Sequence, residues 1–149
     1  MDVEGYFPRI DHARLHGLIA RRFKGAGFLA LMARIVEAGS PDPLGAPGQG
    51  LPIGSLTSQH HANAYLDRAD RFLLEHEAAD VRAHARYMDD MVWCCETHEA
   101  ARRTLVRLGE FMADELGLSL KPGADPLRSD RGMLWCGHRI KPGLVRPST

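Results

Sequence analysis

The chain lacks the features of a disulfide-stabilised or membrane-spanning protein. It has only three cysteines (Cys94, Cys95 and Cys136), whose spacing matches neither a disulfide framework nor a zinc site, so we expect plain thiols. No apolar run approaches the ~20 residues that a membrane-spanning helix needs. No secretory signal opens the sequence, since Asp2 and Glu4 follow Met1 closely. We therefore expect a cytoplasmic protein with no membrane partner.

An excess of positive charge is also missing. The 19 Lys and Arg residues balance 19 Asp and Glu residues, which gives a formal net charge of zero. This balance counts against a self-sufficient nucleic-acid binder, because phosphate neutralisation normally needs a basic surface. Either the basic elements lie elsewhere or the partner is not nucleic acid. With 149 residues and 44% hydrophobic residues, we expect one domain with a packed core over residues 1–149.

The order of patterns predicts an α+β fold, with a mostly antiparallel sheet backed by helices. Apolar periodicity predicts helices, and alternation predicts a hairpin with a tight acidic turn at residues 88–90. Pro8 is expected to interrupt regular structure near the N-terminus. The predicted helices span residues 12–23, 27–38, 55–77 and 97–116; the hairpin spans 82–95; short strands span 1–3, 118–120 and 133–140, the last as a pair about Gly137; loops span 39–54 and 121–131.

The acidic turn is the most unusual feature. Asp89 and Asp90 are adjacent, and neighbouring carboxylates raise one another's pKa unless a cation such as a hard divalent ion compensates them. An ordinary solvated turn explains this pair when it is taken alone. If the first strand lies beside the hairpin, however, Asp2 joins the pair at one sheet edge. Such a trio could hold two metal ions that activate a 3′-hydroxyl and stabilise a departing pyrophosphate. The alternative for Asp2 is a frayed, solvated N-terminus.

Four segments resemble, in order, motifs of reverse transcriptases. Residues 2–12 resemble the first acidic motif, with paired aromatics, Pro and Ile-Asp-His after the aspartate. Residues 50–67, which begin Gly-Leu-Pro-Ile-Gly-Ser-Leu-Thr-Ser-Gln, are similar to the template-grip motif. Residues 87–90, Tyr-Met-Asp-Asp, match the polymerase signature, and residues 132–140 resemble the primer-grip hairpin. Each motif alone is weak, and the ordered set is specific.

The resemblance implies the palm of an RNA-directed DNA polymerase, with a ferredoxin-like antiparallel core. It implies two Mg²⁺ ions, with Mn²⁺ as a substitute. An RNA template, a DNA primer, dNTPs and a retroelement accessory protein are the implied partners. The aliphatic Ile53, where many relatives carry Gln, resembles bacterial enzymes of the diversity-generating retroelement type, in which it accompanies error-prone copying. The resemblance to reverse transcriptases also implies a role for each matching residue. Asp2, Asp89 and Asp90 would be catalytic and bind metal, with the Val3 carbonyl as a further ligand. The substrate-binding residues would be Val3, Phe7, Gly50, Pro52, Ile53, Gly54, Ser58, Gln59, Tyr87 and Met88, and the primer grip would be Trp135, Cys136 and Gly137.

Several of these residues have structural alternatives. Phe7 matches the position that screens the sugar 2′-position of the incoming nucleotide, but simple core packing also explains it. Gly50 and Gly54 would let the backbone approach a substrate closely, and they also fit a glycine-rich loop before a helix. For Ser58 and Gln59 a solvated helix face is the alternative.

The chain also departs from the family pattern. The fingers would precede Asp2 and the thumb would follow residue 140, so we expect little polymerase activity from these 149 residues alone, and the missing basic parts would explain the neutral charge. The family's lysine after the Leu-x-Leu-x-Pro run is absent, with Lys121 close but shifted. Residues 135–138 are Trp-Cys-Gly-His where relatives usually show Phe-Leu-Gly-Tyr. A second function therefore remains open: a catalytically inactive remnant or a nucleic-acid-associated scaffold.

Overall fold

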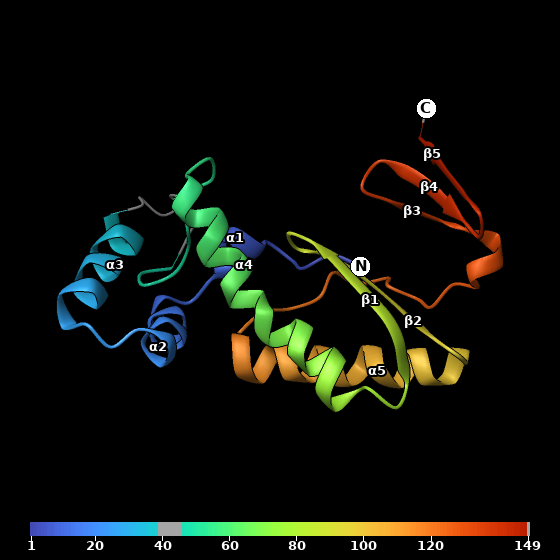
Figure 1. Cartoon of the computed structure of the whole chain (residues 1–149), viewed down its shortest axis with the longest axis horizontal. Helices are drawn as coiled ribbons and strands as arrows, with labels where there is room; N and C mark the ends of the chain where they lie inside the picture. Colours follow the sequence, from blue (N-terminus) through green and yellow to red (C-terminus); the bar gives the residue numbers. More distant parts are fainter. Residues whose placement is uncertain (39–45, 149) are drawn as a thin grey trace.

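The computed structural model describes residues 1–38 and 46–148, and part of the predicted loop over residues 39–54 lies outside these ranges. The fold is mixed α+β with small antiparallel sheets, as the sequence predicts (Figure 1). No helix in the described ranges is long and apolar enough to cross a membrane. The helices are α1 (Tyr6–Arg9), α2 (His12–Arg22), α3 (Ala26–Ala38), α4 (Leu56–Arg71) and α5 (His98–Phe111); π-helical turns η1 (Phe72–His76) and η2 (Met112–Leu116) extend α4 and α5; η3 (Ser129–Arg131) is a short 3₁₀ helix; the strands are β1 (Val81–Tyr87), β2 (Asp90–Cys95), β3 (Met133–Trp135), β4 (His138–Lys141) and β5 (Leu144–Pro147).

Two of the longer helices, α2 and α5, begin at residues whose side chains cap them. The Asp11 carboxylate accepts a hydrogen bond from the Arg14 backbone N–H (2.8 Å) at the start of α2, and Thr97 caps α5 in the same way. The helix α1 was not predicted. Pro8 lies within this single turn, where a missing N–H leaves no hydrogen bond unmade, so the expectation that it interrupts regular structure was wrong.

Residues 1–4 lie between the β1–β2 hairpin and residues 119–121. On one side, Met1 and Met91 exchange backbone hydrogen bonds of 2.9 and 2.8 Å. On the other side, Val3 bridges Leu120 in antiparallel fashion, flanked by a 3.0 Å bond from the Lys121 N–H to the Asp2 carbonyl. The short strands predicted at 1–3 and 118–120 therefore pair with each other, although as an isolated bridge rather than as full strands. Figure 1 shows the N-terminus beside the hairpin.

The hydrophobic core lies between this small sheet and the helices. The helix α5 packs against β2, and η1 packs against β1. The Tyr65 hydroxyl donates a 2.6 Å hydrogen bond to the Leu116 carbonyl and so joins α4 to η2 inside the core. The buried core residues are Val3, Tyr6, Ile10, Leu15, Val36, Leu51, Ala62, Tyr65, Leu66, Ala69, Leu73, Val81, Met91, Leu108, Met112, Leu116 and Leu118.

A separate three-stranded antiparallel sheet follows, in the order β3-β4-β5 (Figure 1). The pair β3–β4 about Gly137 was predicted, and β5 was not. The apolar pattern that could have predicted β5 is short, since only two apolar residues follow the Pro142-Gly143 turn. No residue from 133 to 148 is buried, so this sheet adds nothing to the hydrophobic core.

Candidate metal site at the hairpin tip

The acidic turn contains two residues. Tyr87 pairs with Asp90, so only Met88 and Asp89 connect the strands, one residue fewer than the predicted turn. Met88 has a φ of 55°, in the left-handed region that residues with side chains rarely adopt. Met91 is fully buried, and side chains alternate along a strand, so Asp90 lies on the face of the hairpin away from the core.

Asp2 lies beside Asp89. The Val3 side chain is in the core, so Asp2, its neighbour in the extended segment, lies on the opposite face, like Asp90. Burial raises the pKa of Asp89 above its ordinary value, and the adjacent carboxylate of Asp2 raises it further, while the charge of Lys121 lowers it. The structure thus brings together two of the three predicted catalytic carboxylates, which are far apart in the sequence.

Lys121 supplies positive charge to these carboxylates. Its ammonium group forms an ion pair with the Oδ2 atom of Asp2. The hydrogen bond to Asp2 raises the pKa of Lys121, and the charges of Asp89 and Asp90 contribute to this shift. Asp90 has its own ionic contact, 3.4 Å from the amino group of Met1. All three carboxylates therefore lie within electrostatic reach of one lysine.

One oxygen at this site lacks a partner. The Oδ1 atom of Asp2 is buried and accepts no hydrogen bond from the residues that the structure describes. Leaving a buried acceptor unsatisfied is costly. Carboxylate oxygens are the ligands that Mg²⁺ and Mn²⁺ prefer, so this oxygen fits a hard divalent cation shared with Asp89.

The fit is partial. Within residues 1–38 and 46–148, no group of three or more His, Cys, Asp or Glu side chains is arranged to hold a metal ion. The structure offers the Asp2–Asp89 pair as ligands, and Asp90 is not placed to form a three-carboxylate metal site with them. Val3 as a whole residue is only 1% exposed, so its backbone carbonyl, the further ligand that the resemblance implies, is also shielded from solvent.

The predicted template-grip segment packs against the first acidic motif. The Gly50 N–H donates to the Ile10 carbonyl (2.9 Å), and the His12 Nε2 atom lies 2.7 Å from the Gly50 carbonyl. Gly50 has a φ of 93°, and an added Cβ would lie 3.3 Å from the carbonyl oxygen of Pro8. Packing against α1 therefore requires glycine here, whether or not a substrate approaches.

The remaining residues of that segment differ in exposure. Ile53 is 83% exposed and lies in a turn with Gly54 before α4, so both are accessible. Gln59 is exposed, whereas Ser58 is only 2% exposed and lies on the buried side of α4. Pro52 and Phe7 are half-buried, and Phe7 packs against the core, which agrees with the alternative explanation for that residue.

The predicted primer-grip turn comes close to the acidic tip. Cys136 (φ 47°) and Gly137 (φ 73°) form a two-residue turn with positive φ at both positions, the backbone preferred in tight hairpins. Desolvation and then the charge of Asp90 raise the pKa of Cys136. The second hairpin therefore ends within electrostatic reach of the first. The Nε1 atom of Trp135 is buried without an acceptor among the described residues.

Two residues at the tip were missed as site residues. The family pattern places its lysine elsewhere and so does not point to Lys121. The sequence signal for Arg86 is its position immediately before Tyr87, on a strand beside a helix that carries Asn63 and Asp70 two turns apart. Arg86 binds both of those side chains and also donates a 2.8 Å hydrogen bond to the Met88 carbonyl.

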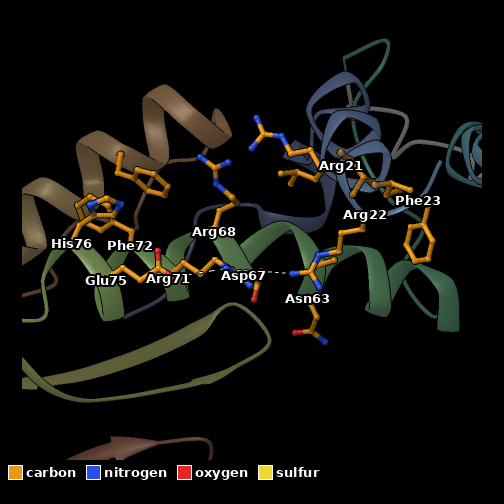
Figure 2. Close-up of a pocket in the computed structure, with 15 residues that line it drawn as sticks. Arg21, Arg22, Phe23, Asn63, Asp67, Arg68, Arg71, Phe72, Glu75 and His76 are labelled. Atoms are coloured by element: carbon orange, nitrogen blue, oxygen red, sulfur yellow. Dashed lines mark hydrogen bonds and ion pairs between the residues drawn. The ribbon is translucent and has the colours of Figure 1, made fainter.

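A hollow of about 670 Å³ lies elsewhere, lined by residues of α2, α4, η1 and α5 (Figure 2). Arginines surround it, and Asp67 binds two of them, Arg22 at 3.2 Å and Arg71 at 2.9 Å. Phe72 stacks on Phe111 at its apolar end. None of the predicted catalytic carboxylates lines this hollow, so it is separate from the acidic tip.

No protein-family model matches the chain, and no curated protein matches it.

Proposed function

We propose that this chain is the palm of a reverse transcriptase, an RNA-directed DNA polymerase of a bacterial retroelement similar to the diversity-generating type. The observation that carries the proposal is the adjacency of Asp2 and Asp89, with a buried Asp2 oxygen that no described residue binds. Two carboxylates held side by side repel each other, and a polymerase needs such a pair to bind its cations.

In this proposal Asp2 and Asp89 would be the principal ligands of two Mg²⁺ ions, replaceable by Mn²⁺, and the resemblance adds the Val3 carbonyl and, if its carboxylate turns toward the pair, Asp90. When bound there, such ions would supply the charge that lowers the pKa of the primer 3′-hydroxyl and stabilises the departing pyrophosphate. The chain's own residues orient the substrates. Tyr87 (66% exposed) and Ile53 present apolar surface to the nucleic acid, and Trp135, Cys136 and Gly137 contact the primer. The substrates and partners are an RNA template, a DNA primer, dNTPs and a retroelement accessory protein.

A Mn²⁺ titration followed by electron paramagnetic resonance tests the metal site without requiring bound substrate. We expect the Asp89→Asn chain to bind Mn²⁺ at least ~10-fold more weakly than wild type, a loss typical even of residues that only support metal ligands. The matched control is Asp125→Asn, which removes the same charge from an exposed loop position and should leave binding unchanged. Equal Mn²⁺ binding by all three chains would contradict the proposal.

Primer extension on an RNA template then tests the reaction. We expect only weak extension from these 149 residues alone. Even weak extension supports a polymerase if it requires Mg²⁺, survives in Asp125→Asn and disappears in Asp89→Asn. Extension that persists in Asp89→Asn would assign the activity to a contaminant.

The ion pair between Lys121 and Asp2 favours a second candidate, a non-catalytic scaffold associated with nucleic acid. In such a protein the lysine would replace the cation permanently. Wild type would then bind no more Mn²⁺ than Asp89→Asn, whereas Lys121→Met would gain binding because the carboxylates lose their internal counter-ion. A polymerase palm predicts measurable binding in wild type already.

A further inference from the structure

A single arginine joins the acidic tip to α4. The Arg86 guanidinium donates to both carboxylate oxygens of Asp70, with the shortest distance 2.6 Å from Nη2 to Oδ2. Its Nη1 atom donates to the Asn63 Oδ1 atom and to the Met88 carbonyl, both at 2.8 Å. We call this set of Arg86, Asn63, Asp70 and the Met88 carbonyl the Arg86 clamp.

The clamp contacts Met88, whose backbone conformation is rare for a residue with a side chain. Met88 holds a left-handed backbone conformation, which persists only where the surroundings impose it. Arg86 fixes its carbonyl, and the Asn63 Nδ2 atom contacts its sulfur at 3.5 Å. Because Asp89 is the next residue, the direction of its carboxylate depends on the backbone that Arg86 holds.

The geometry requires arginine rather than positive charge alone. A guanidinium is planar and offers several N–H donors in fixed directions, so it can bind a carboxylate with two bonds and still reach a carbonyl and an amide oxygen. A lysine ammonium at this position keeps the charge but cannot make the same set of contacts. The Arg86 side chain is only 11% exposed, so these contacts are largely shielded from water.

We propose that Arg86 is the positioning residue of the metal site: by fixing the Met88 carbonyl to α4, it holds Asp89 in line with Asp2. This inference rests on the proposed function. It assigns to Arg86, Asn63 and Asp70 a role in metal affinity, although none of them touches the metal.

The test compares Arg86→Lys with Arg82→Lys. Arg82 lies on the same strand, but it is half exposed and, among residues 1–38 and 46–148, pairs with the exposed Glu96 alone at 2.9 Å, so it controls for the Arg-to-Lys change itself. Mn²⁺ affinity is measured by electron paramagnetic resonance, and amide exchange at Met88, Asp89 and Asp90 by NMR. We expect Arg86→Lys to lower Mn²⁺ affinity ~10-fold, as loss of a residue that orients a ligand typically does, and to accelerate exchange at the tip. Arg82→Lys should change neither.

If Arg86→Lys fails to fold, Asn63→Ala replaces it. Asn63 anchors the Nη1 side of the clamp near the surface, and its removal leaves the Arg86–Asp70 pair in place. For Asn63→Ala we expect the same two changes in smaller size: weaker Mn²⁺ binding and faster amide exchange at the tip. A folded variant with wild-type tip exchange overturns the clamp, and so does faster exchange with unchanged Mn²⁺ affinity, because Arg86 would then be merely structural. By contrast, Mn²⁺ binding that is equal in wild type and Asp89→Asn contradicts the proposed function itself.

Discussion

Asp89 destabilises the metal-free protein because of where it lies. Burial and the neighbouring Asp2 raise its pKa, so the folded chain binds this proton more tightly than the unfolded chain does. The free energy of unfolding therefore falls as the pH rises above ~3.9, the ordinary value for aspartate, and the loss is complete above the raised pKa. At neutral pH the charged pair is a net cost, as expected where function and stability compete.

Replacing Asp89 by Asn should accordingly stabilise the chain. In buffer with a chelator at pH 7, we expect Asp89→Asn to have a higher free energy of unfolding than wild type, and the difference should shrink as the pH is lowered to about 4, near the ordinary aspartate pKa. Urea unfolding at the two pH values measures this, with Asp125→Asn as the control. A difference that does not depend on pH would show that the folded protein does not raise the pKa of Asp89.

At the scale of elements, buried polar contacts decide how the helices are joined. The Tyr65 side chain is fully buried, and its hydroxyl gives the Leu116 carbonyl a hydrogen bond. We expect Tyr65→Phe to lower the free energy of unfolding by about 1–2 kcal/mol, because the carbonyl is left without its donor. Urea unfolding measures this. Tyr87→Phe, at an exposed tyrosine, should change it by less than ~0.5 kcal/mol.

The contact between residues 48–51 and α1 depends on Gly50. We expect Gly50→Ala to lower the free energy of unfolding by roughly 1 kcal/mol or more, since alanine is strained at positive φ and its Cβ would press on the Pro8 carbonyl. Gly17 in the middle of α2 has open space around it, so Gly17→Ala should instead stabilise the chain by ~0.5–1 kcal/mol. Thermal or urea unfolding of both variants checks the opposite signs.

At the scale of the whole molecule, burial is unevenly distributed. The core lies among α2, α4, α5 and the first hairpin, whereas residues 133–148 include no buried side chain. Local opening is easiest where few apolar groups are buried. We expect amides of β3, β4 and β5 to exchange with deuterium much faster than those of α4 and α5.

Leu108→Ala should lower the global free energy of unfolding by ~2–5 kcal/mol and leave exchange in β5 unchanged. Equal protection of the two regions would contradict this division.

Apolar periodicity predicted the long helices, because this signal is local. Asp11 and Thr97 mark helix starts, and apolar spacing gives the faces. The helix α1 and the strand β5 were missed, since each is a single short element with weak local preference. The buried position of Ser58 also could not be predicted, because helix rotation is set by what packs against it.

The sequence by itself determined which chemistry is present: an acidic pair in a hairpin turn, and a carboxylate in an extended segment far away in the chain. Only the tertiary structure decided that Met1 pairs with Met91, which brings Asp2 beside Asp89, and that Lys121 and Arg86 come to the same tip. The physical reason is that strand pairing and side-chain ion pairs join residues distant in sequence, and no local pattern encodes their register.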